Sequence, residues 1–185
     1  MKKITLDHPS GFTEGEITIT GSKSESNRLL ILKSLFPQIL IENLSNSDDT
    51  LLTNQALKTI DSIIDINHAG TAMRFLTAYF ATQQNREVLL TGSQRMQERP
   101  IKLLVNALKD LGAEISYEKK NGYPPLRIKG KKITKSKVAL PANVSSQFIS
   151  ALILIAPSLE KGLTIDLIGK LTSAPYVNMT LKILD

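Results

Sequence analysis

The chain contains no cysteine and no tryptophan, and only two histidines occur among its 185 residues. Without cysteine, disulfide bonds, thiolate metal ligands and a cysteine nucleophile are all excluded. Two histidines are too few for a histidine-rich metal site. Aromatic residues make up only 5% of the chain, which gives little support to base stacking on a nucleic acid.

Acidic residues are the minority charge, and the formal net charge is +6. Such an excess suits nucleic acid, an anionic surface or small anionic substrates. The basic residues are scattered, however, and the densest stretch, 129–137, contains a glycine and is typical of a solvated loop. We therefore expect no nucleic-acid partner.

Long apolar runs are also missing. The N-terminus has no apolar core of the kind found in secretory signals. The longest apolar stretch, 148–157, is too short to cross a bilayer. Its apolar residues cover nearly every face of a helix, which predicts a buried core helix. We expect a cytoplasmic location and no membrane partner.

What the chain does contain is a weak internal repeat of three units, each reading strand, polar turn, helix, strand, polar turn, helix. Strands are expected at 16–20, 39–44, 62–66, 87–91, 137–141 and 163–168. Helices are expected at 28–36, 51–60, 74–82, 101–112, 148–156 and 176–184. A strand pair at 113–119 and 126–130 closes the second unit.

Residues at the expected boundaries support these elements. N-cap positions are predicted for Ser22, Ser24, Asp48 and Ser145. Pro100 suits the first turn of a helix, and Gly112 suits the position just after one. The third unit stops at Asp185 without closing strands, so we expect the chain to be truncated within that unit.

Two of the turns that precede helices carry the residues of an anion site. The turn 21–28 offers free backbone N–H groups and the positive end of a helix, with Lys23 and Arg28 in reach. A capped helix with solvated basic residues is the alternative. In the turn 67–74, Gly70 allows close approach of a ligand, and Thr71 can cap the helix or bind an oxyanion. His68 alone is more typical of a surface residue, and Arg74 could equally pair with a buried carboxylate.

Three further turns extend this pattern. Arg95 and Arg99 can grip a carboxylate or phosphate, unless Arg99 pairs with Glu98. The hydroxyls and amide of 145–147 could hold a phosphate and a sugar-like hydroxyl, although capping alone explains them. In 173–176, proline fixes the turn and the tyrosine ring can pack on a cyclic ligand or simply join the core. Together the five turns predict a small, polyanionic, hydroxylated ligand.

The motifs GSKSESNR, SDDT, HAGTAMR, GSQRMQERPI, NGYPPLRIKG, VSSQF and SAPY occur in this order along essentially the whole chain. In this respect the chain resembles the 5-enolpyruvylshikimate-3-phosphate synthase family. The resemblance implies an α/β (α+β) fold of two globules, each built of repeated βαβαββ-type units around buried helices. Residues 1–12 would supply a strand to the second globule and 13–185 would form the first, with the second globule absent.

The resemblance also implies a reaction and its residues. The family moves the enolpyruvyl group of phosphoenolpyruvate to the 5-hydroxyl of shikimate 3-phosphate by addition and elimination, releasing phosphate, with no metal or organic cofactor. The residues implied for shikimate 3-phosphate are Lys23, Ser24, Arg28, Ser145, Ser146, Gln147, Ser173 and Tyr176. Those implied for phosphoenolpyruvate are Lys23, Gly70, Arg95 and Gln147, and those implied for catalysis are Lys23 and Asp49, with Asp48 alongside.

Two positions depart from the family pattern, since His68 stands where asparagine is usual and Phe75 where a small residue or proline is usual. The partner implied is the missing C-terminal half, without which the chain is expected to be inactive. The alternatives are a relative of the enolpyruvyl transferase that acts on UDP-N-acetylglucosamine, whose usual catalytic cysteine is absent here, and a non-catalytic substrate-binding fragment.

Overall fold

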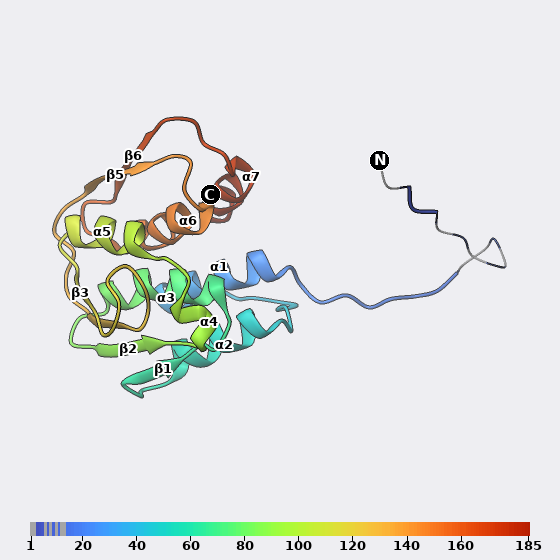
Figure 1. Cartoon of the computed structure of the whole chain (residues 1–185), viewed down its shortest axis with the longest axis horizontal. Coiled ribbons are helices and arrows are strands. Elements are labelled where there is room, and N and C mark those ends of the chain that lie inside the picture. Colours follow the sequence, from blue (N-terminus) through green and yellow to red (C-terminus); the bar gives the residue numbers. More distant parts are fainter. Residues whose placement is uncertain (1–2, 6, 8, 10, 12–13) are drawn as a thin grey trace.

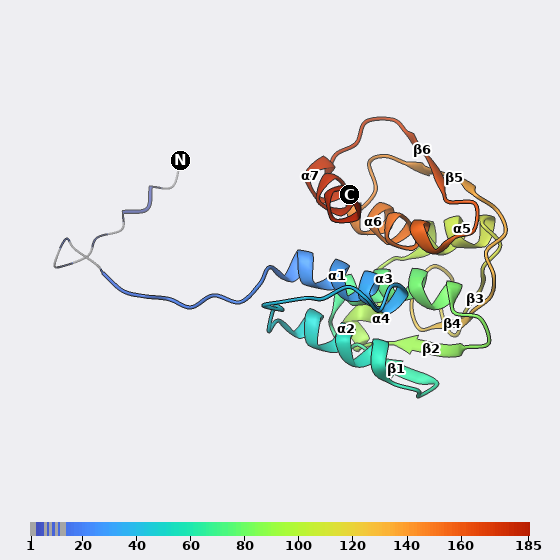
Figure 2. The same cartoon turned by 180° about the vertical axis from the view of Figure 1, so that it is seen from behind.

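The computed structural model describes residues 3–5, 7, 9, 11 and 14–185 (Figure 1). Helices and two small sheets form one globule, and residues 14–20 run out from it without helix or strand (Figures 1 and 2). The predicted mixed α/β class is confirmed. The strand predicted within 1–12 lies largely outside the described residues and stays a prediction. No helix in the described ranges has the length and apolar character needed to span a bilayer.

The larger sheet has the strand order β1-β2-β4-β3. Strands β1 (Ile63–Asp65) and β2 (Glu87–Thr91) run parallel, an arrangement that requires a long crossover connection such as a helix. Strand β4 (Leu126–Lys129) is antiparallel to both β2 and β3 (Glu114–Tyr117). The predicted strand pair that closes the second unit is thus confirmed.

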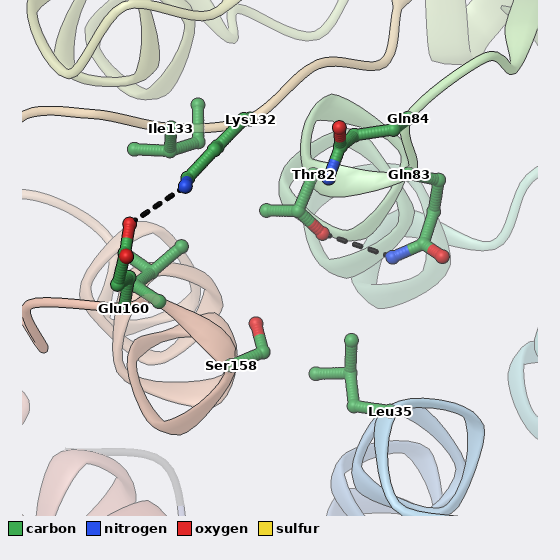
Figure 3. A pocket seen from close by; sticks show the side chains of 9 residues that line it. Leu35, Thr82, Gln83, Gln84, Lys132, Ile133, Ser158 and Glu160 are labelled. Atoms are coloured by element: carbon green, nitrogen blue, oxygen red, sulfur yellow. Dashed lines mark hydrogen bonds and ion pairs between the residues drawn. The ribbon is translucent and has the colours of Figure 1, made fainter.

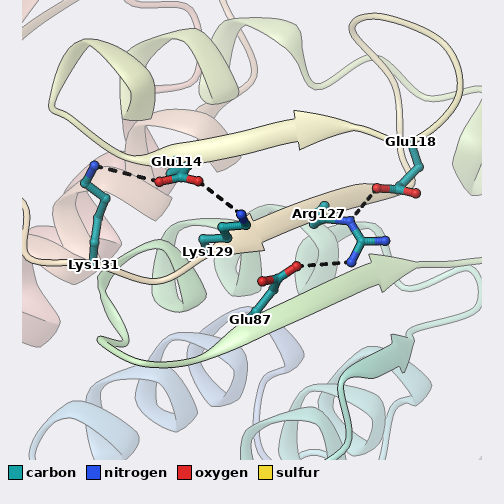
Figure 4. A network of polar contacts seen from close by, with 6 residues as sticks. All are labelled: Glu87, Glu114, Glu118, Arg127, Lys129 and Lys131. Carbon is teal, nitrogen blue, oxygen red and sulfur yellow. Dashed lines mark hydrogen bonds and ion pairs between the residues drawn. The ribbon is translucent and has the colours of Figure 1, made fainter.

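The two faces of this sheet follow the period of two expected for strands. Val88 and Leu90 of β2 are buried in the core. On the opposite face Arg127 donates to Glu87 at 3.1 Å and to Glu118 at 2.7 Å, in an exposed row of charges (Figure 4). Exposed ion pairs contribute little to stability, so the apolar face holds the sheet in place.

The smaller sheet repeats the arrangement of the first. Strands β5 (Lys137–Pro141) and β6 (Thr164–Ile168) are parallel and are connected through α6 (Ser146–Ile155) and the short 3-10 helix η1 (Ala156–Ser158). In the larger sheet α3 (Gly70–Thr82) connects β1 to β2 in the same way. Nearly all residues of α3 and α6 are buried, which confirms the core helix predicted at 148–157.

The first unit differs from its prediction. It consists of α1 (Lys23–Leu35) and α2 (Asp48–Lys58), and the strands predicted at 16–20 and 39–44 are wrong. The segment 16–20 is exposed, and among the described residues it has no neighbouring strand to pair with. The segment 39–44 is interrupted by Asn43, whose φ of 52° is incompatible with a strand.

The remaining helices are α4 (Gln94–Gln97), α5 (Lys102–Asp110) and α7 (Ala174–Leu184). Gly112 ends α5 as predicted: its φ is +106°, and its N–H donates to the Lys109 carbonyl while the next N–H donates to that of Leu108.

The N-terminal boundaries were predicted less well. Ser145 is the N-cap of α6, and its hydroxyl accepts from the Gln147 N–H, as predicted. Ser22 holds the N-cap position of α1 without a side-chain capping bond, which places Ser24 inside the helix. Asp48 is the first residue of α2 rather than its cap, because Ser47 takes that position. Pro100 precedes α5 instead of lying in its first turn.

Helices α1, α3 and α6 run side by side in one direction. Their last turns, with η1 after α6, line a hollow of about 170 Å³ at Leu35, Thr82 and Ser158 (Figure 3). Lys132 pairs with Glu160 at 2.8 Å across this hollow. The first turns of the same helices therefore meet at the other end of the globule.

Gly130 fastens the larger sheet to the end of α3. A Cβ at this position would collide with backbone atoms of Gln83 and would lie 2.7 Å from the Phe80 carbonyl oxygen. We expect Gly130→Ala to lower the free energy of unfolding by about 2 kcal/mol, because backbone cannot move aside. Urea titration measures this. Gly15→Ala, which meets nothing within 4 Å, is the control and should change stability by less than about 0.5 kcal/mol.

Candidate functional site

The first turns of four helices surround one hollow of about 280 Å³, which we call the four-helix hollow. It lies where α1, α3, α6 and α7 begin, so several N–H groups without intrahelical partners face one space. Its lining residues are Lys23, Ser24, Arg28, Thr71, Ser145, Ser146, Gln147 and Tyr176. Aligned helix N-termini and two cations make this hollow electropositive.

Lys23 supplies the mobile charge of the hollow. Its side chain is exposed and forms no ion pair within the described part of the chain. An ammonium on a flexible stem can follow a ligand as it enters.

Arg28 is, by contrast, only 3% exposed and fixed in place. Its Nε donates to the Thr180 hydroxyl at 2.7 Å, and its terminal nitrogens donate to the Ser24 carbonyl, the Ser150 hydroxyl and the Tyr176 carbonyl. Burial lowers the pKa of the guanidinium below its ordinary value, and the opposing effects of Tyr176 and Glu25 are smaller. Arg28 therefore joins α1, α6 and α7 and leaves little hydrogen-bonding capacity for a ligand.

The start of α3 is partly neutralised. Asp49, from α2, accepts a hydrogen bond from the Thr71 N–H at 3.0 Å, which caps α3 from outside the helix. The Thr71 hydroxyl in turn accepts from Gln147 Nε2 at 3.3 Å. Thr71 thus connects α2, α3 and α6 and sets the direction of the Gln147 amide.

A second hollow of about 580 Å³ adjoins the first turn of α3. It is lined by His68, Arg95, Met96 and Arg99, and we call it the Arg95 hollow. At its edge His68 Nε2 lies 3.2 Å from an Asp48 carboxylate oxygen, with both side chains more than half exposed. The Arg95 side chain is exposed and forms no ion pair among the described residues.

The sequence that forms these two hollows matches the model of a known protein family. The model of EPSP synthase (3-phosphoshikimate 1-carboxyvinyltransferase) matches residues 8–65 and 59–185. The chain belongs to the EPSP synthase family.

Several members of the EPSP synthase family resemble this chain over its whole length. It is 48% identical over 183 residues to a 3-phosphoshikimate 1-carboxyvinyltransferase from Bacteroides fragilis, covering 98% of the chain and 44% of that protein. The counterpart from Colwellia psychrerythraea is 39% identical over 211 residues, covering 100% and 49%. The chain spans about half the length of the curated relatives it matches.

A solved EPSP synthase structure from Acinetobacter baumannii has the same fold. It matches with a TM-score of 0.71 at 22% identity, over 89% of this chain and 42% of that one. At this identity the likeness concerns the fold alone.

The structure brings together most of the side chains that the EPSP synthase motifs predicted for shikimate 3-phosphate. All of them except Ser173 line the four-helix hollow. Ser173 occupies the N-cap of α7, where its carbonyl accepts from the Tyr176 N–H. These residues come from three separate segments of the chain. The prediction that the turns pack together requires such a convergence.

The residues predicted for phosphoenolpyruvate are more dispersed. Lys23 and Gln147 line the four-helix hollow, whereas Arg95 lines the neighbouring one. Gly70 lies beneath the guanidinium of Arg99, and a Cβ at Gly70 would collide with that group. A ligand that approaches the Gly70 backbone from this side has to displace Arg99.

Sequence reasoning missed two features of this site. Thr71 was recognised as a possible cap or oxyanion ligand, but its bond to Gln147 was not foreseen. The catalytic role implied for Asp49 stays a prediction, and its bond to the start of α3 is an addition that the sequence does not show. Neither bond could be read from the sequence, because the bonded residues are 22 and 76 positions apart.

Proposed function

We propose that this chain forms the shikimate 3-phosphate-binding half of an EPSP synthase. The complete enzyme would transfer the enolpyruvyl group of phosphoenolpyruvate to the 5-hydroxyl of shikimate 3-phosphate and release phosphate. The observation that carries the proposal is the four-helix hollow, in which hydroxyls, an amide, a tyrosine ring and two cations face one space. This set matches a ligand that is anionic, hydroxylated and cyclic.

Each group has a chemical task in this proposal. Ser145 and Ser146, at the N-terminus of α6, would hold the 3-phosphate through hydroxyls and free N–H groups. Tyr176, which is half exposed, would pack its ring against the cyclohexene. Gln147, held by Thr71, would bind a ring hydroxyl.

Lys23 would act on the transferred group. In the proposed reaction the 5-hydroxyl loses its proton as it attacks C2 of phosphoenolpyruvate, and C3 is protonated. The resulting ketal then loses phosphate from C2 and a proton from C3, which restores the C=C bond. The ammonium at the mouth of the hollow would stabilise the charge on that phosphate as it leaves. No metal is assigned to any step.

Titration of the chain with shikimate 3-phosphate tests the binding role. We expect amide NMR shifts at Lys23, Ser146, Gln147 and Tyr176, with affinity that falls as salt is added, because the site is open to water. Shikimate, which lacks the phosphate, is the control and should bind more weakly. Shifts confined to the loop 129–137, or no shifts at millimolar ligand in a folded sample, would remove the assignment.

Catalysis is expected to fail in the chain alone. Because it spans about half of its relatives, we propose that the remaining catalytic groups come from the part it does not cover. The chain should therefore release no phosphate from phosphoenolpyruvate when shikimate 3-phosphate is added. A hybrid that continues into the remaining part of the Bacteroides fragilis relative should restore release, and turnover by the chain alone would contradict the proposal.

A further inference from the structure

A third hollow, of about 490 Å³, shares Ser145 and Gln147 with the four-helix hollow. Its lining residues come from α3, from α6, from the start of α5 with the residues just before it, and from the segment between β5 and α6. We call it the arginine hollow, because Arg74 and Arg99 both line it. It adjoins the four-helix hollow through Ser145 and Gln147 and the Arg95 hollow through Arg99, but its lining includes neither Lys23 nor Tyr176.

Arg74 is buried in the wall of this hollow with only neutral acceptors. It is 4% exposed, and its terminal nitrogens donate to the carbonyls of Gly70 and Pro100, each at 3.2 Å. Its Nε has no hydrogen-bond partner in the described part of the chain. Burial, and secondarily the neighbouring Arg99, lower the pKa of Arg74 to about 10.

Arg99 adds a second guanidinium beside the first. Its planar head rests on the first turn of α3, where Gly70 has no side chain to obstruct it. Within the described ranges the side chain forms no hydrogen bond and no ion pair, so the predicted alternative of pairing with Glu98 does not occur. Two neighbouring cations therefore line one hollow whose described lining contains no carboxylate, and the nearby Asp49 raises the pKa of Arg74 less than burial and Arg99 lower it.

Apolar side chains also line this hollow. Leu103, at the start of α5, is 43% exposed although it is a large aliphatic residue, and Phe148 of α6 joins it in the lining. Asn143 supplies a polar edge. An anion relieves the repulsion between two guanidiniums and can use their fork of donors, while an apolar body attached to it covers Leu103.

We propose that the arginine hollow binds a small carboxylate with a flat, apolar body. The carboxylate meets Arg99 and the free Nε of Arg74, and the body packs against Leu103 and Phe148. The proposal does not depend on shikimate 3-phosphate binding, since it uses different cations. Its ligand class differs as well, because the apolar wall suits a hydrocarbon ring rather than a hydroxylated one.

Benzoate is the probe for this site, with amide NMR of the whole chain as the readout. We expect shifts at Leu103, Asn143 and Phe148, with a dissociation constant on the order of 1 mM for so small a ligand. Arg99→Gln should weaken binding at least about tenfold, as loss of a charge-assisted contact does. Lys23→Gln, in the other hollow, is the matched control and should leave benzoate binding unchanged.

Two further ligands and one further variant make the outcome decisive. Benzamide, which has the same shape without the charge, and acetate, which lacks the apolar body, should both bind much more weakly than benzoate. Leu103→Glu places a carboxylate in the same hollow as the arginines and should also abolish binding. This variant tests the proposal even if Arg99→Gln disturbs the fold. Equal binding of benzamide or acetate, unchanged binding to Arg99→Gln, or shifts centred on Lys23 and Tyr176 would overturn the proposal. A shikimate 3-phosphate titration on the same sample reports separately on the proposed function.

Discussion

Arg28→Ala should lower the free energy of unfolding by about 3 kcal/mol, through lost hydrogen bonds and the cavity left in the core. The side chain joins α1 to α6 and α7 through Ser150, Thr180 and the Tyr176 carbonyl, and its guanidinium lies 5.3 Å from the centre of the Phe75 ring. The change does not strand the hydroxyls, because Ser150 and Thr180 remain bonded to each other at 2.8 Å. Urea unfolding followed by circular dichroism measures the loss.

Two companion variants separate the contributions to this effect. Arg28→Met keeps most of the volume and removes the desolvated charge, so it should cost less than about 1.5 kcal/mol. Arg95→Ala removes an arginine that is exposed and should change stability by less than about 0.5 kcal/mol. If Arg28→Ala unfolded like Arg95→Ala, the residue would be free to serve mainly as a ligand contact.

Lys23→Ala should lower turnover roughly 100-fold in the hybrid with the Bacteroides fragilis relative, a typical effect of removing one preorganised charge from a reaction centre. The fold should survive, because Lys23 is exposed and forms no ion pair among the described residues. The measurement is phosphate release at saturating substrates, with a thermal melt of the same preparation.

Lys33→Ala is the matched control for this variant. Lys33 is an exposed lysine of the same helix, in its last turn, at the end remote from the four-helix hollow. Its removal should leave turnover within about twofold. Equal losses in the two variants would mean that the net charge of the helix matters, and that Lys23 has no role of its own in the reaction.

The sequence predicts the second unit of this fold well and the first unit poorly. Strand β2 occupies 87–91 as predicted, and β1, β3 and β4 lie within their expected ranges. Buried and more exposed residues alternate along each of these strands, and each pairs with another strand of the same unit. The segments 16–20 and 39–44 also carry strand-like residues. A pattern of side chains cannot show whether a partner strand exists, and neither segment has one in the part of the chain that the structure describes.

The sequence predicts which turns form the candidate site, but it does not predict the hydrogen bonds between them. Helix starts are visible in sequence as small polar residues, and their convergence followed from the repeat. Burial is different: Arg28 and Lys23 look equivalent in the motif, yet one is fixed in the core and the other reaches solvent. That distinction depends on α7, more than 140 residues away, which closes over Arg28.

The wall shared by two hollows has a thermodynamic consequence. Ser145 and Gln147 line both the four-helix hollow and the arginine hollow, and the Gln147 amide donates to the Thr71 hydroxyl, which belongs to the first of them. If a ligand on one side rotates that amide, the other side loses or gains the same contact. Linkage then requires reciprocity: the factor by which a carboxylate changes the affinity for shikimate 3-phosphate must equal the factor by which shikimate 3-phosphate changes the affinity for the carboxylate.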